Sequence, residues 1–136
     1  FVVCDAIPGC KVRGALTTYK NHPAIFISRR FKTHDYVWFA IIHELAHLLL
    51  HYQKNYTHIS YDNDVEDCRD KEQEANQFAR DFFIDPEDYR KFTANNAFTS
   101  ATIRNFAAQQ GVTTSIVIGR LQHDGHLTYA EGNYLK

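Results

Sequence analysis

The chain has 136 residues, of which 44% are hydrophobic and 14% aromatic, so it has enough apolar material for one compact domain with its own core. Its formal net charge of -1 excludes the strong basic field with which proteins hold nucleic acid or an anionic membrane surface. The three cysteines form no CxxC pair and the longest apolar stretch, residues 36–42, is far too short to span a bilayer, so we expect a protein of the reducing cytoplasm without a membrane anchor.

The N-terminal part predicts an antiparallel sheet. Val12–Thr18 and Ala24–Ser28 are short and rich in β-formers, and the turn-forming residues 20–23 separate them, which is typical of a hairpin. Val2 and Val3 form a further apolar run. The chain begins at Phe1 and contains no methionine, so we expect it to have been excised from a longer product.

A long helix is expected next. Thr33 can cap a helix from about His34 to Tyr52, and almost every residue between Tyr36 and Leu50 is apolar except two histidines and a glutamate. A helix that is apolar on all sides is a buried helix. Residues 53–69 are polar and show no periodicity, which predicts a long loop. We expect this loop to border the functional residues of the helix.

The remainder reads as helical. Asp70, with Gln73 at the capping-box position, begins a second helix that ends near Ile84, and Asp85-Pro86 begin a third. Two further helices are expected over residues 99–110 and 113–124, closed by Gly111 and Gly125, before an extended segment around residues 127–129. Strands followed by helices indicate the α+β class, here as a single domain over residues 1–136.

The polar residues of the first helix form the pattern His43-Glu44-Leu45-Ala46-His47. Residues four apart on a helix project from one face, so His43 and His47 can place two imidazole nitrogens on one Zn²⁺. Glu44 can then accept a proton from a metal-activated water, which is the general-base role of this motif. Two ordinary core histidines are the alternative, but each would need a polar partner inside an apolar helix. The pattern therefore predicts a zinc-dependent peptidase.

A catalytic zinc site needs a third protein ligand, and Glu72 is the predicted one. Glu72 shares a helix face with Ala75, Asn76 and Ala79, whereas its competitor Glu74 falls on a face that looks solvated. Asn76, one turn beyond Glu72, is a candidate for holding a ligand in place through its amide.

The group that stabilises an oxyanion stays open. His51, one turn past His47, and His123 are the candidates, although a helix-end histidine is also favourable to the helix dipole. Four acidic residues of the polar loop, Asp62, Asp64, Glu66 and Asp67, are interpreted as a solvated charge run rather than a second metal site.

These residues resemble the ImmA/IrrE metallopeptidase family, also called the domain of unknown function 955. The resemblance rests on HELAHLLLH at residues 43–51 and EQEANQFA at residues 72–79. It extends to RGA at 13–15, YVWF at 36–39 and IGRLQHDG at 118–125, which look like the branch fused behind helix-turn-helix regulators of the antitoxin type. The likeness spans nearly the whole chain.

The resemblance implies a small thermolysin-like (gluzincin-type) fold in which His43, His47 and Glu72 bind zinc and Glu44 is the base. It also implies cleavage of a protein substrate, a transcriptional repressor, in bacteria or their mobile elements, and hence a link to transcription regulation and toxin-antitoxin systems. No helix-turn-helix segment precedes Phe1, so such a domain would lie in a missing N-terminal part. We expect an extended substrate to pair with an edge strand near Ala24–Ser28.

Two alternatives remain. In the first, the fold is kept but the site is a catalytically silent zinc-binding regulatory or antitoxin domain, which a fourth ligand such as Cys68 or another histidine would favour. In the second, residues 103–121 form a helix-turn-helix-like hairpin that binds DNA. Only Arg104 and Arg120 are basic there, too few phosphate contacts for tight binding, so no direct nucleic acid partner is expected.

Overall fold

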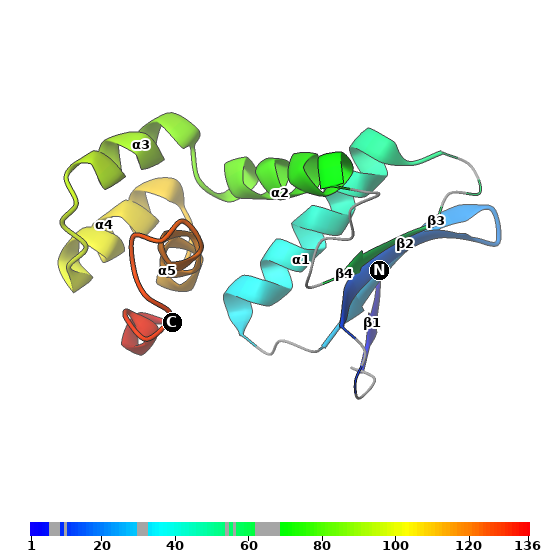
Figure 1. Cartoon of the computed structure of the whole chain (residues 1–136), viewed down its shortest axis with the longest axis horizontal. Coiled ribbons are helices and arrows are strands. Elements are labelled where there is room, and N and C mark those ends of the chain that lie inside the picture. The colour runs from blue at the N-terminus through cyan, green and yellow to red at the C-terminus, as the bar shows by residue number, and fades with distance from the viewer. Residues whose placement is uncertain (6–8, 10, 30–32, 54, 56, 62–68) are drawn as a thin grey trace. The chain divides into compact units, whose positions relative to one another are not determined.

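The structure is a computed structural model of residues 1–136, and it describes all of them except 6–8, 10, 30–32, 54, 56 and 62–68. The chain divides into two compact units, the first made of residues 1–32 and 36–79 and the second of residues 33–35 and 80–136. Strands and helices occur together, which confirms the α+β class (Figure 1). The single domain over the whole chain stays a prediction.

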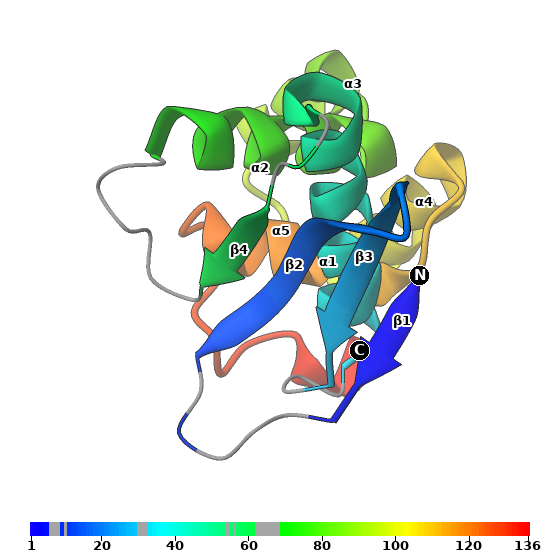
Figure 2. The ribbon, with the colours of Figure 1, turned by 90° about the vertical axis from the view of Figure 1, so that its right-hand side faces the viewer.

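A four-stranded sheet forms one layer of the first unit. Its strands are β1 (Val2–Cys4), β2 (Val12–Tyr19), β3 (His22–Ser28) and β4 (His58–Tyr61), in the order β1-β3-β2-β4 (Figure 2). The predicted hairpin is confirmed as the antiparallel pair β2–β3. Its two-residue turn places Lys20 and Asn21 at φ 47° and 64°, the left-handed backbone that suits the twist of a tight hairpin.

Three sequence-based expectations for this sheet were wrong. The sheet is mixed rather than wholly antiparallel, because β1 pairs with β3 in parallel. Strand β3 lies between β1 and β2, and its residues Phe26 and Ile27 are paired on both sides, so Ala24–Ser28 is not the edge strand that was expected. The segment expected to be a loop contains β4, which pairs antiparallel with β2 and forms one edge of the sheet.

The metal-motif helix packs on one face of the sheet. Helix α1 (His34–Ala46) continues into a π-helical turn, η1 (His47–His51), instead of the uninterrupted α-helix to Tyr52 that was expected. Leu16, Ile25 and Ile27 of the sheet meet a set of partly buried apolar residues from this segment: Ala40, Ile41, Leu48 and Tyr52. Burial on all sides was a wrong expectation, since Trp38 is 46% and Leu49 62% exposed. The sheet packs along one side of the helix only.

Helix α2 (Arg69–Phe83) follows, and its start at Arg69 places Asp70 inside the first turn rather than at the cap. The second unit contains α3 (Pro86–Ala94), α4 (Ser100–Gln110), α5 (Thr114–His123) and the 3₁₀ turn η3 (Asn133–Leu135). Its core comprises Ile84, Tyr89, Ile103, Phe106, Ala107, Val117, Ile118, Leu121 and Leu135. Residues 127–129 form no strand, contrary to expectation.

Local sequence signals explain these helix boundaries. Asp85 caps α3, and Thr99 and Thr102 form a reciprocal capping box at α4. Gly111 ends α4 at φ 68°, a conformation that glycine adopts without a steric penalty. In the part of the chain that the structure describes, no helix has both the length and the apolar character needed to cross a membrane.

The cap of α3 gives a prediction on stability. The Asp85 carboxylate accepts hydrogen bonds from the backbone N–H groups of Glu87 and Asp88, both at 2.9 Å. Replacing Asp85 by Ala leaves both donors without this acceptor, and we expect a loss of about 1 kcal/mol in the free energy of unfolding, measured by urea titration. Asp85→Asn keeps a capping oxygen and should unfold close to the wild type. Equal stability of the Ala variant and the wild type would contradict this role.

Candidate metal centre

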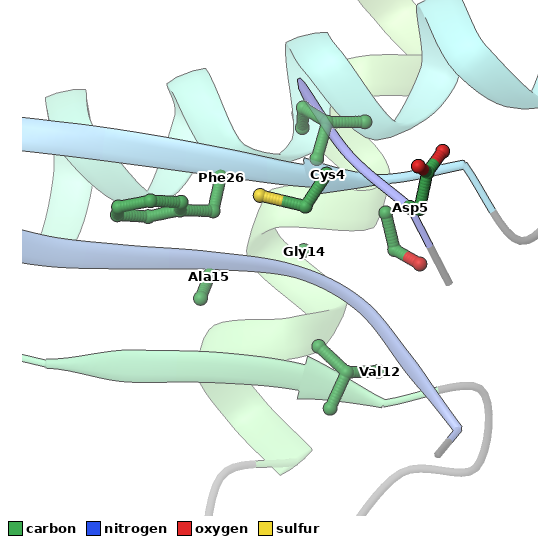
Figure 3. A pocket seen from close by; sticks show the side chains of 8 residues that line it. Cys4, Asp5, Val12, Gly14, Ala15 and Phe26 are labelled. Carbon is green, nitrogen blue, oxygen red and sulfur yellow. The ribbon is translucent and has the colours of Figure 1, made fainter. Parts of the chain in front are cut away.

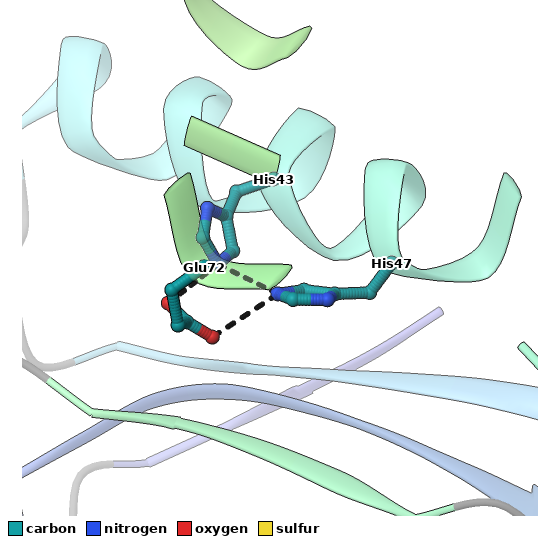
Figure 4. Close-up of side chains that lie close together, drawn as sticks. All are labelled: His43, His47 and Glu72. Atoms are coloured by element: carbon teal, nitrogen blue, oxygen red, sulfur yellow. Dashed lines mark hydrogen bonds and ion pairs between the residues drawn. The ribbon is translucent and has the colours of Figure 1, made fainter. Parts of the chain in front are cut away.

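Three buried side chains converge in the first unit: His43 from α1, His47 from η1 and Glu72 from α2 (Figure 4). The Nε2 atom of His47 lies 3.1 Å from His43 Nε2 and 3.1 Å from Glu72 Oε1. His43 Nε2 lies 3.3 Å from Glu72 Oε2, close enough for an ion pair but without hydrogen-bond geometry. The three side chains are at most 4% exposed. They are the one group among the described residues with the spacing of a metal site.

The helical faces explain this convergence. His43 and His47 are four residues apart and therefore project from the same side of the helix. On α2, Glu72 shares its face with Ala75 and Ala79, which are both fully buried. Glu72 joins the two histidines, as the sequence pattern suggests, whereas Glu74 is exposed and pairs with His51.

The arrangement fits a metal ion on its own chemistry. Burial lowers the pKa of His47 to about 4, so its imidazole is neutral at physiological pH and offers a lone pair. The Glu72 carboxylate has only acceptor oxygens, and its Oε2 is buried without a hydrogen bond from the described residues. Tetrahedral zinc with ligand bonds of about 2.0 to 2.1 Å places its ligand atoms roughly 3.3 Å apart. The two distances from His47 Nε2, 3.1 Å to His43 Nε2 and 3.1 Å to Glu72 Oε1, match edges of such a tetrahedron, and one ligand atom from each of the three residues lies within 4.8 Å of the others.

Two further side chains hold the Glu72 carboxylate, and sequence reasoning missed both. His58 of β4 donates from Nε2 to Glu72 Oε1 at 2.6 Å, and Arg13 Nη2 lies 3.7 Å from Oε2. Burial opposes ionisation of Glu72, but its interactions with the neighbouring His43, His47 and His58 outweigh that effect and hold its pKa well below the usual value. Glu72 is therefore an anion in the folded protein.

The backbone of β2 explains how Arg13 reaches this carboxylate. The register between β2 and β4 shifts at Arg13, where Val12 pairs with Tyr61 and Gly14 with Ser60. Such a bulge adds one residue to a strand and re-aims its side chain. The arginine guanidinium thereby lies beside Glu72.

Glu44, the predicted base, lies directly against the sheet. It is 1% exposed, and a Cβ added at Gly14 would stand only 2.4 Å from its Oε1 atom. With any other residue at position 14, the Glu44 side chain would have to shift. Burial raises the pKa of Glu44, although a hydrogen bond with Ser60 and the neighbouring His43 act in the opposite direction. Ser60 Oγ also lies 3.4 Å from His43 Nε2, so it connects the Glu44 carboxyl to a candidate ligand.

The remaining predicted residues lie in different surroundings. The Nδ1 atom of His51 lies 3.0 Å from the Nδ1 atom of His47. Asn76 is half-buried on α2 and makes no hydrogen bond to the three converging residues within the described ranges, so its role stays a prediction. His123 belongs to the second unit, where it contacts Arg80 and Asp124. The acidic run 62–67 and Cys68 lie outside the described residues.

A separate hollow lies on the sheet between β1, β2 and β3 (Figure 3). Its lining is mainly apolar: Cys4, Asp5, Val12, Gly14, Ala15, Phe26, Ile27 and Ser28. None of the three converging side chains lines it. The candidate metal centre is therefore the stronger chemical feature of this unit.

This geometry predicts one metal ion per chain. We expect His43→Ala, His47→Ala and Glu72→Ala each to abolish stoichiometric zinc binding, because two ligands rarely retain the ion. Metal content after dialysis is the measurement. His123→Ala, which changes a 60% exposed side chain of the second unit, is the matched control and should keep one zinc per chain. Zinc retained by all three ligand variants would place the ion elsewhere.

Comparison with known proteins agrees with this geometry. The model of the peptidase M78 family, described as the IrrE N-terminal-like domain, matches residues 8–122, which include His43, Glu44, His47 and Glu72. A search of curated proteins found no match. The matched segment carries the buried histidine pair, the adjacent glutamate and the glutamate of the following helix. The chain therefore belongs to the IrrE N-terminal-like domain family, and it is a domain of the metallopeptidase type.

Proposed function

We propose that this domain is a zinc-dependent metallopeptidase that hydrolyses a peptide bond in a protein substrate. The observation that carries the proposal is a group of three ligand side chains, and not four, in the described chain, with the Glu44 carboxyl buried beside them. Three protein ligands are typical of catalytic zinc, because the fourth position stays open for water or substrate. A structural zinc is usually enclosed by four.

The role that we propose for each residue follows from its surroundings. His43, His47 and Glu72 would hold the zinc ion, which when bound supplies a lowered water pKa and polarises a peptide carbonyl. Glu44 accepts the proton of the attacking water at its carboxylate and then delivers it to the leaving nitrogen. The raised pKa of Glu44 suits this exchange, since a base works best when its pKa approaches the operating pH.

Strand β4 is the proposed guide for the substrate. It is an edge strand, and its buried residues His58 and Ser60 face the site while Ile59 is 42% exposed. An extended peptide that pairs with the edge of β4 to which no described strand is paired would run past the three ligands, with main-chain hydrogen bonds fixing its register. This replaces the edge expected at Ala24–Ser28.

The biological setting is proposed from the resemblance of the sequence. The substrate would be a transcriptional repressor in the bacterial cytoplasm, and a helix-turn-helix regulator domain of the antitoxin type would precede this segment in the full protein. Zinc as the natural metal belongs to the same proposal, supported by the two imidazoles and one carboxylate of the site.

One observation favours a silent zinc-binding regulator as the second candidate. His58 is buried, its ring centroid lies 4.1 Å from that of His47, and its Nε2 already touches Glu72. A small rotation of its side chain would offer the ion a fourth protein ligand. The DNA-binding alternative gains no such support, because Arg120 of α5 is already paired with Asp124 and stacked on Tyr89.

Replacement of Glu44 by Gln tests the proposal. The variant keeps the size of the side chain but cannot accept the proton, so we expect an unchanged zinc content and a rate of cleavage lower by about 100-fold or more. Cleavage of candidate repressors by the zinc-loaded chain is followed by gel electrophoresis and mass spectrometry. Equal cleavage by both proteins, or no bound metal in the wild type, would refute a metallopeptidase. Zinc binding without cleavage by the wild type favours the silent regulator.

Gly14 provides a second test of the same base. In Gly14→Ala the new Cβ would meet Oε1 at 2.4 Å and Cδ at 2.8 Å, so the Glu44 carboxyl must move. We expect the rate of cleavage to fall by about 100-fold, the cost of misplacing a catalytic group by roughly 1 Å, while zinc remains bound. Ala15→Ser, at the neighbouring half-buried position on the other face of β2, is the control and should stay active. Full activity of Gly14→Ala would exclude a catalytic Glu44 in this position.

A further inference from the structure

We propose that His51 and Glu74 form a positioning pair that sets the tautomer and the orientation of His47 for metal binding. This proposal rests on the metal site proposed above. His51 Nδ1 lies 3.0 Å from His47 Nδ1, and His51 Nε2 lies 2.8 Å from Glu74 Oε2. The three side chains form a continuous series of hydrogen bonds from a surface carboxylate to a buried imidazole.

The direction of these hydrogen bonds follows from the carboxylate. An ionised Glu74 can only accept, so His51 donates to it from Nε2–H. A neutral His51 then has a lone pair at Nδ1, which accepts from the Nδ1–H group of His47. The remaining lone pair of His47 is at Nε2, the atom that faces His43 and Glu72. The series thus selects the tautomer that a metal ion requires.

Helix α2 therefore holds His47 at both ends of its ring. Glu72 lies 3.1 Å from Nε2, and Glu74 acts on Nδ1 through His51. The π-helical turn supports this arrangement, because it contains His47 and His51 at its two ends and brings their ring centroids to 5.2 Å. Short π segments occur often at functional sites.

His43 has no equivalent support. Its Nδ1 atom is buried without a hydrogen bond from any described residue. Among the described residues, a carboxylate acting through an intermediate group is thus found for His47 and not for His43. Carboxylate partners of metal-bound histidines fix the ring and raise its basicity, and their loss typically lowers metal affinity by about 10 to 100-fold.

A contribution to metal binding can be separated from a contribution to folding. Glu74 is 66% exposed, and an ion pair at such a position adds little to stability in water. Its main effect should then appear in the zinc-bound state. Removal of Glu74 should weaken zinc binding while the metal-free chain unfolds at nearly the same urea concentration.

The test measures the dissociation constant for zinc by competition with a chromophoric chelator. We expect Glu74→Ala and His51→Phe each to weaken binding by about 10 to 100-fold. Glu74→Gln should restore most of the affinity, because its amide oxygen can still accept from His51. Glu87→Ala is the control, since it removes an exposed carboxylate that pairs with Lys91 in the second unit. It should bind zinc as the wild type does.

Two further readouts distinguish positioning from simple packing. The double variant Glu74→Ala/His51→Phe should lose no more affinity than His51→Phe alone, because both changes break one series. Nitrogen chemical shifts of the wild type should report His47 protonated at Nδ1, and this signal should become mixed in Glu74→Ala. Cobalt in place of zinc should give altered visible absorption in Glu74→Ala, but an unaltered spectrum in Glu87→Ala.

The outcomes separate this proposal from the one on which it rests. Zinc binding by the wild type with unchanged affinity in Glu74→Ala and His51→Phe would overturn the positioning pair and leave the metallopeptidase proposal intact. A wild type that binds no metal would overturn both. Additive losses in the double variant would also contradict a single series.

Discussion

The convergence of three buried side chains, two imidazoles and one carboxylate, is the feature on which the proposed site of the first unit depends. Two imidazole nitrogens and a carboxylate lie within 3.3 Å of one another. Buried polar groups without partners cost about 1 to 3 kcal/mol each, and the Oε2 atom of Glu72 has no hydrogen-bond partner among the described residues. A bound cation would satisfy this oxygen, which supports the proposed metal site.

One face of the sheet contacts this cluster of side chains. Gly14 and Leu16 of β2 pair with Ser60 and His58 of β4, so these four residues share the face that α1 covers. On this face Leu16 packs against the helix and Gly14 leaves room for the Glu44 side chain. His58 and Ser60 contact the candidate metal site. The bulge at Arg13 adds a cation at the same end. Strand β4 thus contributes more to the chemistry than to the hydrophobic core.

The arrangement of these elements explains which parts of the fold and of the candidate site could be predicted from the sequence and which could not. The spacing of His43 and His47, and the alanine face that identifies Glu72, follow helical periodicity and were predictable. Strand β4 was not predictable, because its inward-facing positions hold His58 and Ser60. The alternation that identifies a half-buried strand has apolar residues at such positions. The π-helical turn has no local signature in HLLLH, and the parallel pairing of β1 depends on contacts distant in sequence. Polar inward positions of a short strand beside a metal motif are a signal that could have found His58.

The two buried glutamates lie in surroundings that fit the two different roles proposed for them. Burial acts on both, and it would raise the pKa of each if nothing else were present. Glu72 lies beside three imidazoles, one of which, His58, donates a hydrogen bond to it, and these interactions reverse the effect, so Glu72 stays an anion suited to a cation. The Gly14 backbone and one serine lie beside Glu44, so burial remains the dominant effect on its pKa. The raised pKa favours proton exchange by this carboxyl. Environments that push two carboxyl pKa values apart assign ligand and base without any difference in side-chain chemistry.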